Sequence, residues 1–354
     1  NALELLRKAP GVTVDNNDNV NVKGKNAVKI MIDGREVPLD GKDLSALLKG
    51  TQASDITNIE IISNPSAKYD AAGNAGIINI RLKKNKALGT NGNFGLEGIY
   101  GKSLKGGGNL SLNHRAKNVN LFGSYNGHYG DWYNDQRFQR EQNGQFYNQE
   151  NEEIWENRYQ GYRAGVDWYL NSKHTVGVLV NGNVNPGDWR NHSFTNIGKT
   201  GNNGQIDTLL RASNNVESFR SNINANFNYR FADTTGHSLN FDFDYGNFDI
   251  QGASYQPNLY YSPNGSELLR QRIYRNQTPT AIDIYTAKAD YEQRLFKGTL
   301  GLGVKVADVK TDNTFNFFNV IDGQSELDED VSNRFIYEER TSAAYINYNR
   351  MFGK

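Results

Sequence analysis

Two stretches between residues 216 and 246 alternate almost without error between apolar and polar side chains. The apolar parity of the first holds Phe219, Ile223, Ala225, Phe227, Tyr229 and Phe231, and the polar parity holds Asn222, Asn224, Asn226, Asn228 and Arg230. After the polar break at 232–236, Leu239, Phe241, Phe243 and Tyr245 alternate with Asn240, Asp242, Asp244 and Gly246. Successive side chains of a strand point to opposite faces, so the pattern predicts a hairpin with one apolar and one hydrated face.

The same alternation recurs along most of the chain after residue 86 and predicts ten long strands. We place them at 89–101, 105–115, 117–129, 157–170, 174–184, 216–231, 238–250, 279–296, 299–310 and 335–352. Several of these are much longer than the five or six residues common in soluble sandwiches and propellers. The length, together with aromatic residues near the strand ends, favours the wall of a transmembrane β-barrel over a soluble β-protein.

The connections between these strands differ in length. Short links occur at Ala116, Asn171–Lys173, Ala232–Gly236 and Lys297–Gly298, and near Lys105. Long polar links are expected near 130–156, 185–215, 251–278 and 311–334. Outer-membrane barrels combine tight periplasmic turns with long extracellular loops.

The parity of each strand separates a lipid face from a lumen face. The residues assigned to lipid include Val119, Leu121, Tyr125, Tyr162, Ala164, Val166, Trp168, Val176, Val178, Val180, Tyr285, Ala287, Tyr291, Leu300, Leu302, Val304, Val306, Ala344, Ile346 and Tyr348. Those assigned to the lumen include Arg163, Asp167, Lys288, Asp290, Glu292, Lys305, Asn347 and Asn349. A midplane Lys or Arg costs about 2–4 kcal/mol against lipid but far less in a wet lumen.

Composition adds limits on the class of protein. The 354-residue chain has a formal net charge of zero and no cysteine, while Tyr (20) and Phe (17) are plentiful. No apolar run is long enough for a membrane-spanning helix. The balanced charge argues against a nucleic-acid partner. The first residues, 1–7, read as the middle of a helix and not as a signal peptide, so we expect the natural chain to begin earlier.

Residues 1–86 differ from the rest, because their predicted elements are short and mixed. We expect a helix around Leu3 and Leu6 that ends at Pro10–Gly11, strands at 12–14, 20–22, 28–32, 59–62 and 77–82, and a helix around Leu44–Leu48. Ten strands cannot enclose such a unit, since about 22 are needed for a plugged lumen. We therefore expect residues 87–354 to be the first part of a larger barrel, incomplete at its C-terminus; the rival is a closed ten-strand barrel with a soluble domain outside.

A specific resemblance appears at 55–80. The run Ile59-Glu60-Ile61-Ile62, the segment Pro65-Ser66-Ala67-Lys68-Tyr69 and the glycine loop leading to Gly76-Ile77-Ile78-Asn79-Ile80 resemble the end of the plug domain of TonB-dependent outer-membrane receptors. Leu5–Val12 and the hairpin Ile32-Asp33-Gly34-Arg35 match the same pattern in the expected order. The likeness covers residues 1–86, and the barrel region is similar to the Bacteroidetes outer membrane protein beta-barrel branch in its architecture.

The resemblance implies a mainly β fold: an antiparallel transmembrane barrel of about 22 strands with a small α+β plug, residues 1–86, inside the lumen. It implies a non-enzymatic receptor in the cell outer membrane that imports a siderophore, cobalamin, oligosaccharide or peptide. The implied partners are TonB, outer-membrane lipids and a surface lipoprotein. No TonB box is visible, so energy coupling is implied by the family only.

Two groups of site residues follow. The plug-motif residues are Asp33, Gly34, Glu60, Pro65, Ser66, Tyr69, Gly73, Gly76 and Asn79. The candidate ligand-contacting aromatics, in or beside the long links, are Trp132, Tyr133, Trp155 and Trp189. These aromatics stack on a ligand or belong to the outer membrane-interface girdle, and the sequence leaves both open. The inward Asn and Asp of 222–244 are expected to hydrate the lumen and to hydrogen-bond the plug.

Other chemistry is disfavoured. Asp15–Asn19 resembles the start of a calcium loop but lacks the required Gly and Glu, so a polar hairpin tip is expected. Gly73–Gly76 lacks a following GK[ST] and is interpreted as a tight turn and not as a phosphate cradle. The five histidines show no metal-ligand spacing, so no metal, cofactor or catalytic residue is predicted. The competing functions are a structural or assembly subunit whose plug never opens and, less favoured, a barrel hydrolase.

Overall fold

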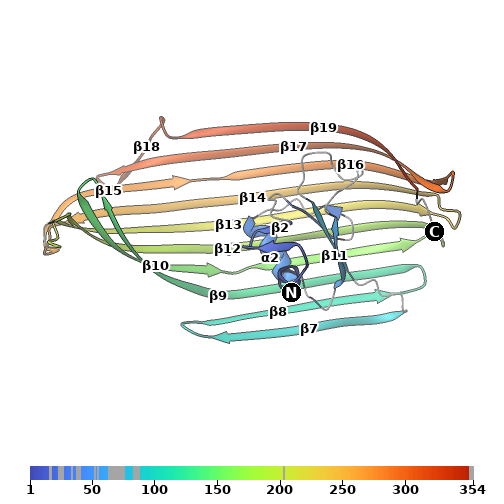
Figure 1. Cartoon of the computed structure of the whole chain (residues 1–354), viewed down its shortest axis with the longest axis horizontal. Helices are drawn as coiled ribbons and strands as arrows, with labels where there is room; N and C mark the ends of the chain where they lie inside the picture. The colour runs from blue at the N-terminus through green and yellow to red at the C-terminus, as the bar shows by residue number, and fades with distance from the viewer. Residues whose placement is uncertain are drawn as a thin grey trace.

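The computed structural model describes residues 1–15, 18–22, 28–32, 35–36, 41–51, 53, 56–62, 76–82, 88–201 and 204–350. Figure 1 shows two parts: a small α/β unit, formed by residues up to 82, and a wide antiparallel sheet that begins at residue 89. The predicted mainly β architecture is confirmed.

The described residues of the α/β unit form two helices and six short strands. Its elements are α1 (Ala2–Arg7), β1 (Val12–Val14), β2 (Val20–Val22), β3 (Lys29–Ile32), β4 (Arg35–Glu36), α2 (Gly41–Gly50), β5 (Ile56–Ile62) and β6 (Ile77–Leu82). They agree with the elements expected from the sequence. Helix α1 starts at a capping box in which the Asn1 side chain accepts a hydrogen bond from the Glu4 backbone N–H. Strands β1 and β2 form a hairpin, and the other four form a sheet in the order β4-β3-β6-β5.

This unit has a hydrophobic core of its own. The buried residues that form it are Ala2, Leu3, Leu6, Val12, Val20, Val22, Ile30, Leu48, Ile56, Ile78 and Ile80. Strand β6 is central, with β3 parallel to it and β5 antiparallel. Central strands that are covered on both faces read as continuous apolar runs, which explains why Ile77, Ile78 and Ile80 lie almost consecutively.

The large sheet contains thirteen strands. They are β7 (Gly89–Tyr100), β8 (Leu104–Arg115), β9 (Val119–Gln142), β10 (Gln145–Asn157), β11 (Gln160–Tyr169), β12 (His174–Lys199), β13 (Thr208–Ala232), β14 (Ser238–Tyr261), β15 (Leu268–Gln277), β16 (Thr280–Leu295), β17 (Gly298–Ile321), β18 (Gln324–Leu327) and β19 (Asn333–Asn349). All their pairings are antiparallel. Strands β10 and β11 both lie between β9 and β12 in one register, so they act as a single wall strand.

Two further pairs of strands each occupy one place in the wall. Strands β15 and β16 share one register against β14 and β17, and they are separated only at Thr278–Pro279. Proline has no N–H to donate, which accounts for a break in the ladder there. Strands β18 and β19 both pair with β17. The thirteen strands therefore form ten wall strands, as predicted from the alternation.

The long polar links predicted between strands are not loops. Strands β9, β12, β13, β14 and β17 continue into these segments, so that each strand is 24 to 26 residues long in total. They pair with their neighbours as tall hairpins. A membrane needs only about 9–11 residues of a tilted strand, so more than half of each hairpin projects beyond it. Their polar sequence concealed this, because a strand with water on both faces shows no alternation.

The turns at the two ends of the sheet differ, and the short links are where they were predicted. The tall hairpin of β9 and β10 closes with Asn143 and Gly144 at positive φ (52° and 72°), a two-residue tip suited to the twist of the strands. At the opposite end, in the turn before β14, the backbone N–H groups of Thr235 and His237 donate to the Asp233 carboxylate. Hydrogen bonds from the Thr235 hydroxyl and the His237 N–H lower the pKa of Asp233.

The two faces of the wall have the predicted chemistry. Phe227, Phe241 and Val304 are 45%, 36% and 55% exposed on the convex face, so they do not lie in a dry interior. This apolar band ends where ion pairs begin. One of them joins the Asp308 carboxylate to the Arg340 guanidinium at 2.8 Å. Aromatic pairs lie at its limits, with Tyr245 and Tyr285 at 5.0 Å between ring centroids.

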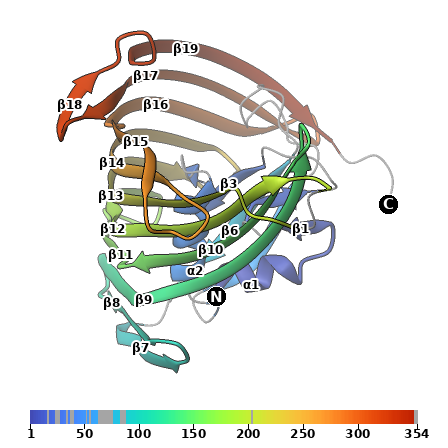
Figure 2. The same ribbon diagram turned by 90° about the vertical axis from the view of Figure 1, so that its left-hand side faces the viewer.

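The sheet curves around the α/β unit, which lies on its concave side (Figure 2). Among the described residues, β7 pairs only with β8 and β19 only with β17, so the sheet is an open arc and not the closed ten-strand barrel considered as a rival. Neither helix in the described part of the chain is long and apolar enough to cross a membrane.

Candidate functional site

Three tryptophans line up across the concave face of the wall. In the strand register Trp132 on β9 is opposite Trp155 on β10, and Trp155 is opposite Trp189 on β12. Directly paired residues share a face, and this parity is opposite to that of the lipid-facing Leu121 and Val178. We call Trp132, Trp155 and Trp189 the tryptophan row.

The row lies where the wall extends past the α/β unit. Trp155 is two residues from the end of β10, and β10 lies to the left of the unit in Figure 1, toward the hairpin tips. The predicted placement of these aromatics in or beside loops is thus corrected, because all three are strand residues. Their concave orientation also excludes the membrane-interface girdle for them.

The rings remain partly open. Trp132 and Trp155 are 37% and 38% exposed. The rings of Trp155 and Trp189 are tilted against each other with centroids 5.6 Å apart. His128 lies 5.1 Å from Trp132, and the Lys105 ammonium lies 4.5 Å from the centre of the same ring.

A row of amides and one carboxylate lies directly beside the tryptophans, one step toward the tips. Asn134 and Asn191 donate from their Nδ2 atoms to Glu153, at 3.1 and 3.2 Å. The next residue in this row, on β13, is Asn214, which pairs with Asn191. The Asn214 Oδ1 and the Trp189 indole Nε1 are shielded from solvent and have no hydrogen-bond partner in the described part of the structure.

On the other side of the tryptophans the wall is made of small residues. Gly130 and Gly187 precede Trp132 and Trp189 by two positions and so share their face, and Asn157 and Ser218 complete this row. The Ser218 hydroxyl donates to the Gly187 carbonyl at 2.6 Å. The side chain of Lys105, on β8, lies over Gly130, where an added Cβ would meet its Cγ at 2.6 Å.

Three further charged groups at this height lie on the convex face. Glu156 accepts hydrogen bonds from Arg158 at 2.9 Å and from Arg190. All three have the parity opposite to the tryptophan row. Tyr133 is on the convex face as well, with the Lys102 ammonium 4.6 Å from its ring centre, so it is separated from the three tryptophans.

Further along the wall, toward the short turns, an asparagine ladder follows the concave face of β13. Asn228 donates to Asn226 at 2.9 Å, and Asn226 donates to Asp244 at 2.7 Å. Asn224 donates to Asn222 at 3.3 Å. The inward side chains predicted to bind the plug are thus hydrogen-bonded to one another.

The plug-motif residues are brought together only in part. Glu60 on β5 and Asn79 on β6 are cross-strand partners, and the Asn79 Nδ2 donates to Glu60 at 2.7 Å. The Arg81 guanidinium also donates to Glu60 at 3.0 Å and lowers the pKa of that carboxyl. Gly76 has φ 147°, a conformation that L side chains rarely adopt, and its carbonyl accepts from the Lys29 N–H. The remaining motif residues, Asp33, Gly34, Pro65, Ser66, Tyr69 and Gly73, lie outside the described residues.

Asp18, at the tip of the β1–β2 hairpin, holds the α/β unit together. It accepts hydrogen bonds from Arg7 on α1 and Lys49 on α2, each at 2.6 Å, and from Ser45 at 3.0 Å. Burial alone would raise the pKa of Asp18, but Lys49, Ser45 and Arg7 outweigh it and lower that pKa below 3.8. Two cationic side chains therefore occupy this carboxylate in the β1–β2 hairpin.

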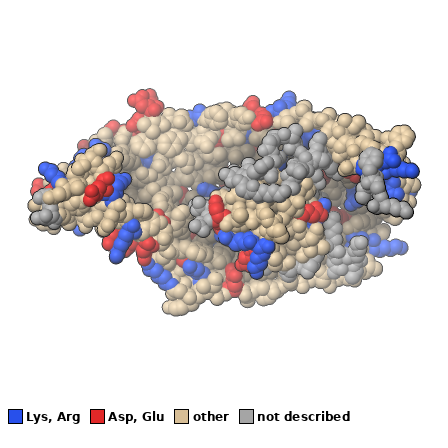
Figure 3. Space-filling model, in the orientation of Figure 1, with Lys and Arg blue, Asp and Glu red and all other residues tan. Residues whose placement is uncertain are grey.

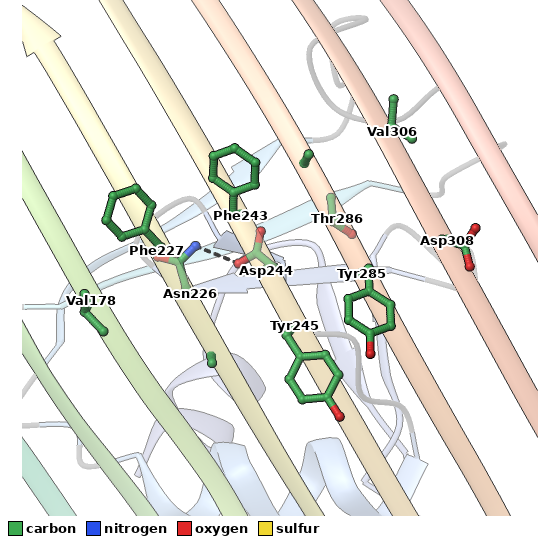
Figure 4. A pocket seen from close by; sticks show the side chains of 12 residues that line it. Val178, Asn226, Phe227, Phe243, Asp244, Tyr245, Tyr285, Thr286, Val306 and Asp308 are labelled. Carbon is green, nitrogen blue, oxygen red and sulfur yellow. Dashed lines mark hydrogen bonds between the residues drawn. The ribbon is translucent and has the colours of Figure 1, made fainter.

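No group of three or more His, Asp or Glu side chains suited to a metal ion occurs among the described residues. A depression of about 480 Å³ lies on the convex face, lined mainly by apolar side chains such as Phe227, Phe243, Tyr245 and Tyr285 (Figure 4). The α/β unit is seen behind the wall in this view, so the depression opens away from it. Two alanines, Ala225 and Ala287, create the space, which lies within the apolar band that faces lipid.

Sequence reasoning found the tryptophans but missed the groups around them. Glu153 and Asn191 are 38 residues apart, and only the strand register places them side by side. Asp18 was missed because its partners are 11 and 31 residues away. Nothing local distinguishes such residues from ordinary polar surface.

Comparison with known proteins supports the barrel assignment. Residues 230–354 match the outer membrane protein beta-barrel family. No curated protein sequence matches the chain. Among solved structures, the ferric citrate transporter FecA in its unliganded form is similar at 14% identity over 98% of this chain and 57% of its own, with a TM-score of 0.40.

Two other solved structures are similar at the same level. The ferric enterobactin receptor PfeA from Pseudomonas aeruginosa is 12% identical over 92% of this chain and 67% of its own, with a TM-score of 0.41. The RagAB peptide importer is 9% identical over 95% and 65%, with a TM-score of 0.33. The chain spans 57% of the length of the FecA chain that it matches.

The predicted location in the outer membrane is confirmed, as is the recognition made from the sequence at the level of the barrel. This chain has a mainly β, outer-membrane β-barrel architecture, and its last third, residues 230–354, matches the outer membrane protein beta-barrel family.

Proposed function

We propose that this chain is the gate and part of the ligand-binding wall of a receptor that imports a ligand across the outer membrane with energy supplied through TonB. The observation that carries the proposal is a folded α/β unit with its own core on the concave side of a membrane wall (Figure 2). In the described part of the chain, the hydrophobic core of this unit contains no residue of the wall. The unit can therefore move without exposing that core to water. The polar face of the wall suits such a movement, because water can replace its contacts.

In this proposal residues 1–86 are the plug and residues 87–354 the wall. The concave tryptophan row is open toward the tips of the tall hairpins, where a ligand arrives from outside. Movement of the plug then opens a path along the asparagine-lined wall. TonB pulls on the receptor to drive this movement, and a surface lipoprotein is a further proposed partner. No step of this cycle breaks a covalent bond, so no catalytic residue is needed.

Deleting residues 1–86 from the full-length protein tests the gate. Cells that produce the deletion variant should become sensitive to vancomycin, which is too large for ordinary porins, whereas cells with the intact protein should not. Heat-modifiable migration of the variant would show that its barrel is folded in the outer membrane. Unchanged resistance with a folded barrel would overturn the gating role.

Energy coupling separates an importer from a structural subunit with the same fold. Uptake of radiolabelled ferric citrate, cobalamin, maltoheptaose and a tryptic peptide mixture should be compared in cells lacking the receptor and in cells lacking TonB. We expect uptake of one probe class to fall in both. If loss of the receptor changes the uptake of none of the four probes, the protein is better described as a structural subunit. The same conclusion follows if the affected uptake persists in cells without TonB.

A further inference from the structure

We propose that the tryptophan row is a binding platform for a neutral oligosaccharide. This inference rests on the proposed receptor function and adds the chemical class of the ligand. It depends on three features of the wall: the alignment of the rings, the hydrogen-bonding groups beside them, and the small number of charged side chains on the concave face at the same height.

The alignment comes from the strand register. Trp132, Trp155 and Trp189 stand on three consecutive wall strands, and neighbouring strands are about 4.8 Å apart. Three large rings therefore follow one line across the wall. An extended chain of rings is the ligand shape that contacts all three at once. The C–H faces of a sugar ring are attracted to the electron-rich face of an indole, so linked sugars fit this line.

The groups beside the rings suit hydroxyl groups. Asn134 and Asn191 have amides that both donate and accept, and Glu153 accepts. Asn214 has an acceptor and Trp189 a donor that lack partners in the described structure. A sugar hydroxyl donates and accepts at once, so it can pair with either kind of group.

The charges favour a neutral ligand over an anionic one. In the tryptophan row and the rows on either side of it, on β9, β10, β12 and β13, the only charged side chain of the concave face is Glu153. Arg158 and Arg190 lie on the other face and are bound to Glu156. Lys105, on β8, adds a cation beside the row, and its ammonium lies 4.5 Å from the centre of the Trp132 ring.

The distribution of charged side chains around the tryptophan row also bears on the charge of the ligand. Figure 3 shows Lys, Arg, Asp and Glu at both ends of the molecule, on the α/β unit and along the lower-left edge of the wall. Ferric siderophore complexes that carry negative charge would instead need several concave cations here, since a charged ligand is held by opposite charge.

The full-length receptor, purified in detergent, should be screened on an array of neutral and acidic glycans. Hits are then titrated by calorimetry and by quenching of tryptophan fluorescence. We expect a neutral oligosaccharide to bind, and Trp155→Ala and Trp189→Ala each to weaken it by about tenfold or more, as for buried aromatic anchors. Trp168→Phe is the matched control, because Trp168 is 55% exposed on the convex, lipid-facing side and should leave the affinity unchanged.

Folding and function are checked separately. Each variant must reach the outer membrane in heat-modifiable form, and Trp155→Phe, which keeps an aromatic ring, should retain more affinity than Trp155→Ala. Binding of ferric enterobactin or cobalamin that Trp155→Ala abolishes, with no glycan bound, would overturn the glycan class but leave the receptor function standing. Glycan binding that survives loss of Trp155 and Trp189 would overturn the platform. Failure of the receptor function itself would appear instead as unchanged uptake in the TonB-deleted strain.

Discussion

At the scale of single residues, Asp18 shows how one carboxylate can join three elements. It contacts α1 through Arg7 and α2 through Lys49, while it sits in the β1–β2 hairpin at φ 65°. Its own side chain is 20% exposed, but Arg7 and Lys49 are 44% and 54% exposed, so solvent screens much of the attraction. The contacts position the hairpin more than they add to the total free energy of unfolding.

Asp18→Asn should loosen the hairpin at neutral pH, at a cost of about 1 kcal/mol for hydrogen bonds to partly exposed charged groups. The folded-state pKa of Asp18 is lowered, so its stabilising effect is full above the unfolded value and is lost as the pH falls below about 4. A spin label at Thr13→Cys, in a chain without native cysteine, reports this mobility. The label should become mobile between pH 5 and pH 2 in the parent, but be equally mobile at both pH values with Asp18→Asn. A parent label that does not respond to pH would contradict the role of Asp18.

The lipid-facing and lumen-facing parities make a second residue-scale prediction. Val304 is 55% exposed in the apolar band, so Val304→Arg should destabilise the folded barrel by about 2–4 kcal/mol. Thr286→Lys places a cation on the opposite, concave face near Asp244 and should be tolerated. The amount of heat-modifiable, folded protein in outer-membrane fractions should be measured for both variants. Equal loss in the two variants would contradict the assignment of faces.

At the scale of elements, the tall hairpins are the main departure from the expected loops. Backbone pairing continues through the polar segments because each N–H and C=O on one strand finds a partner on the next, whether lipid or water lies outside. The register is unbroken from the lipid-facing part of β12 to its tip. Rigid hairpins hold the tryptophan row in fixed positions, which flexible loops would not do.

An epitope inserted between Asn143 and Gly144 should be detected on intact cells, because this tip lies at the far end of a tall hairpin. The same epitope inserted between Thr234 and Thr235, in the short turn before β14, should be detected only after lysis. Antibody labelling of intact and lysed cells measures the difference. Labelling in the reverse order would invert the proposed orientation of the wall.

At the scale of the whole molecule, the core of the α/β unit is separate from the wall. Among the described residues, the core cluster consists of residues between 2 and 80, whereas most large apolar side chains of the wall are exposed, with Leu179 and Phe248 among the few that are buried. Two parts that share no core can unfold or move independently.

Ile78→Ala should therefore destabilise the α/β unit alone, by about 2–5 kcal/mol, since Ile78 is fully buried in its core. Hydrogen exchange of the full-length receptor in detergent should show faster exchange in α1, β3 and β6. Strands β12 and β13 should keep the exchange rates of the parent protein. Faster exchange in the wall strands as well would show that the two parts form one cooperative unit, and would weaken the gating proposal.

Much of this architecture follows from sequence alone, because strand faces depend on local alternation. The parity of Phe227 against Asn226 needs only the two-residue repeat of a strand, so the lipid and lumen faces and the ten wall strands were predictable. The elements of the α/β unit were predictable too, since Pro10–Gly11 and short apolar runs mark their limits. The tertiary structure alone decided which distant residues meet. Strand register placed Trp132, Trp155 and Trp189 in one row, and packing of two helices against a hairpin brought Arg7 and Lys49 to Asp18. Such contacts depend on pairing between segments far apart in the chain, and no local pattern encodes that register.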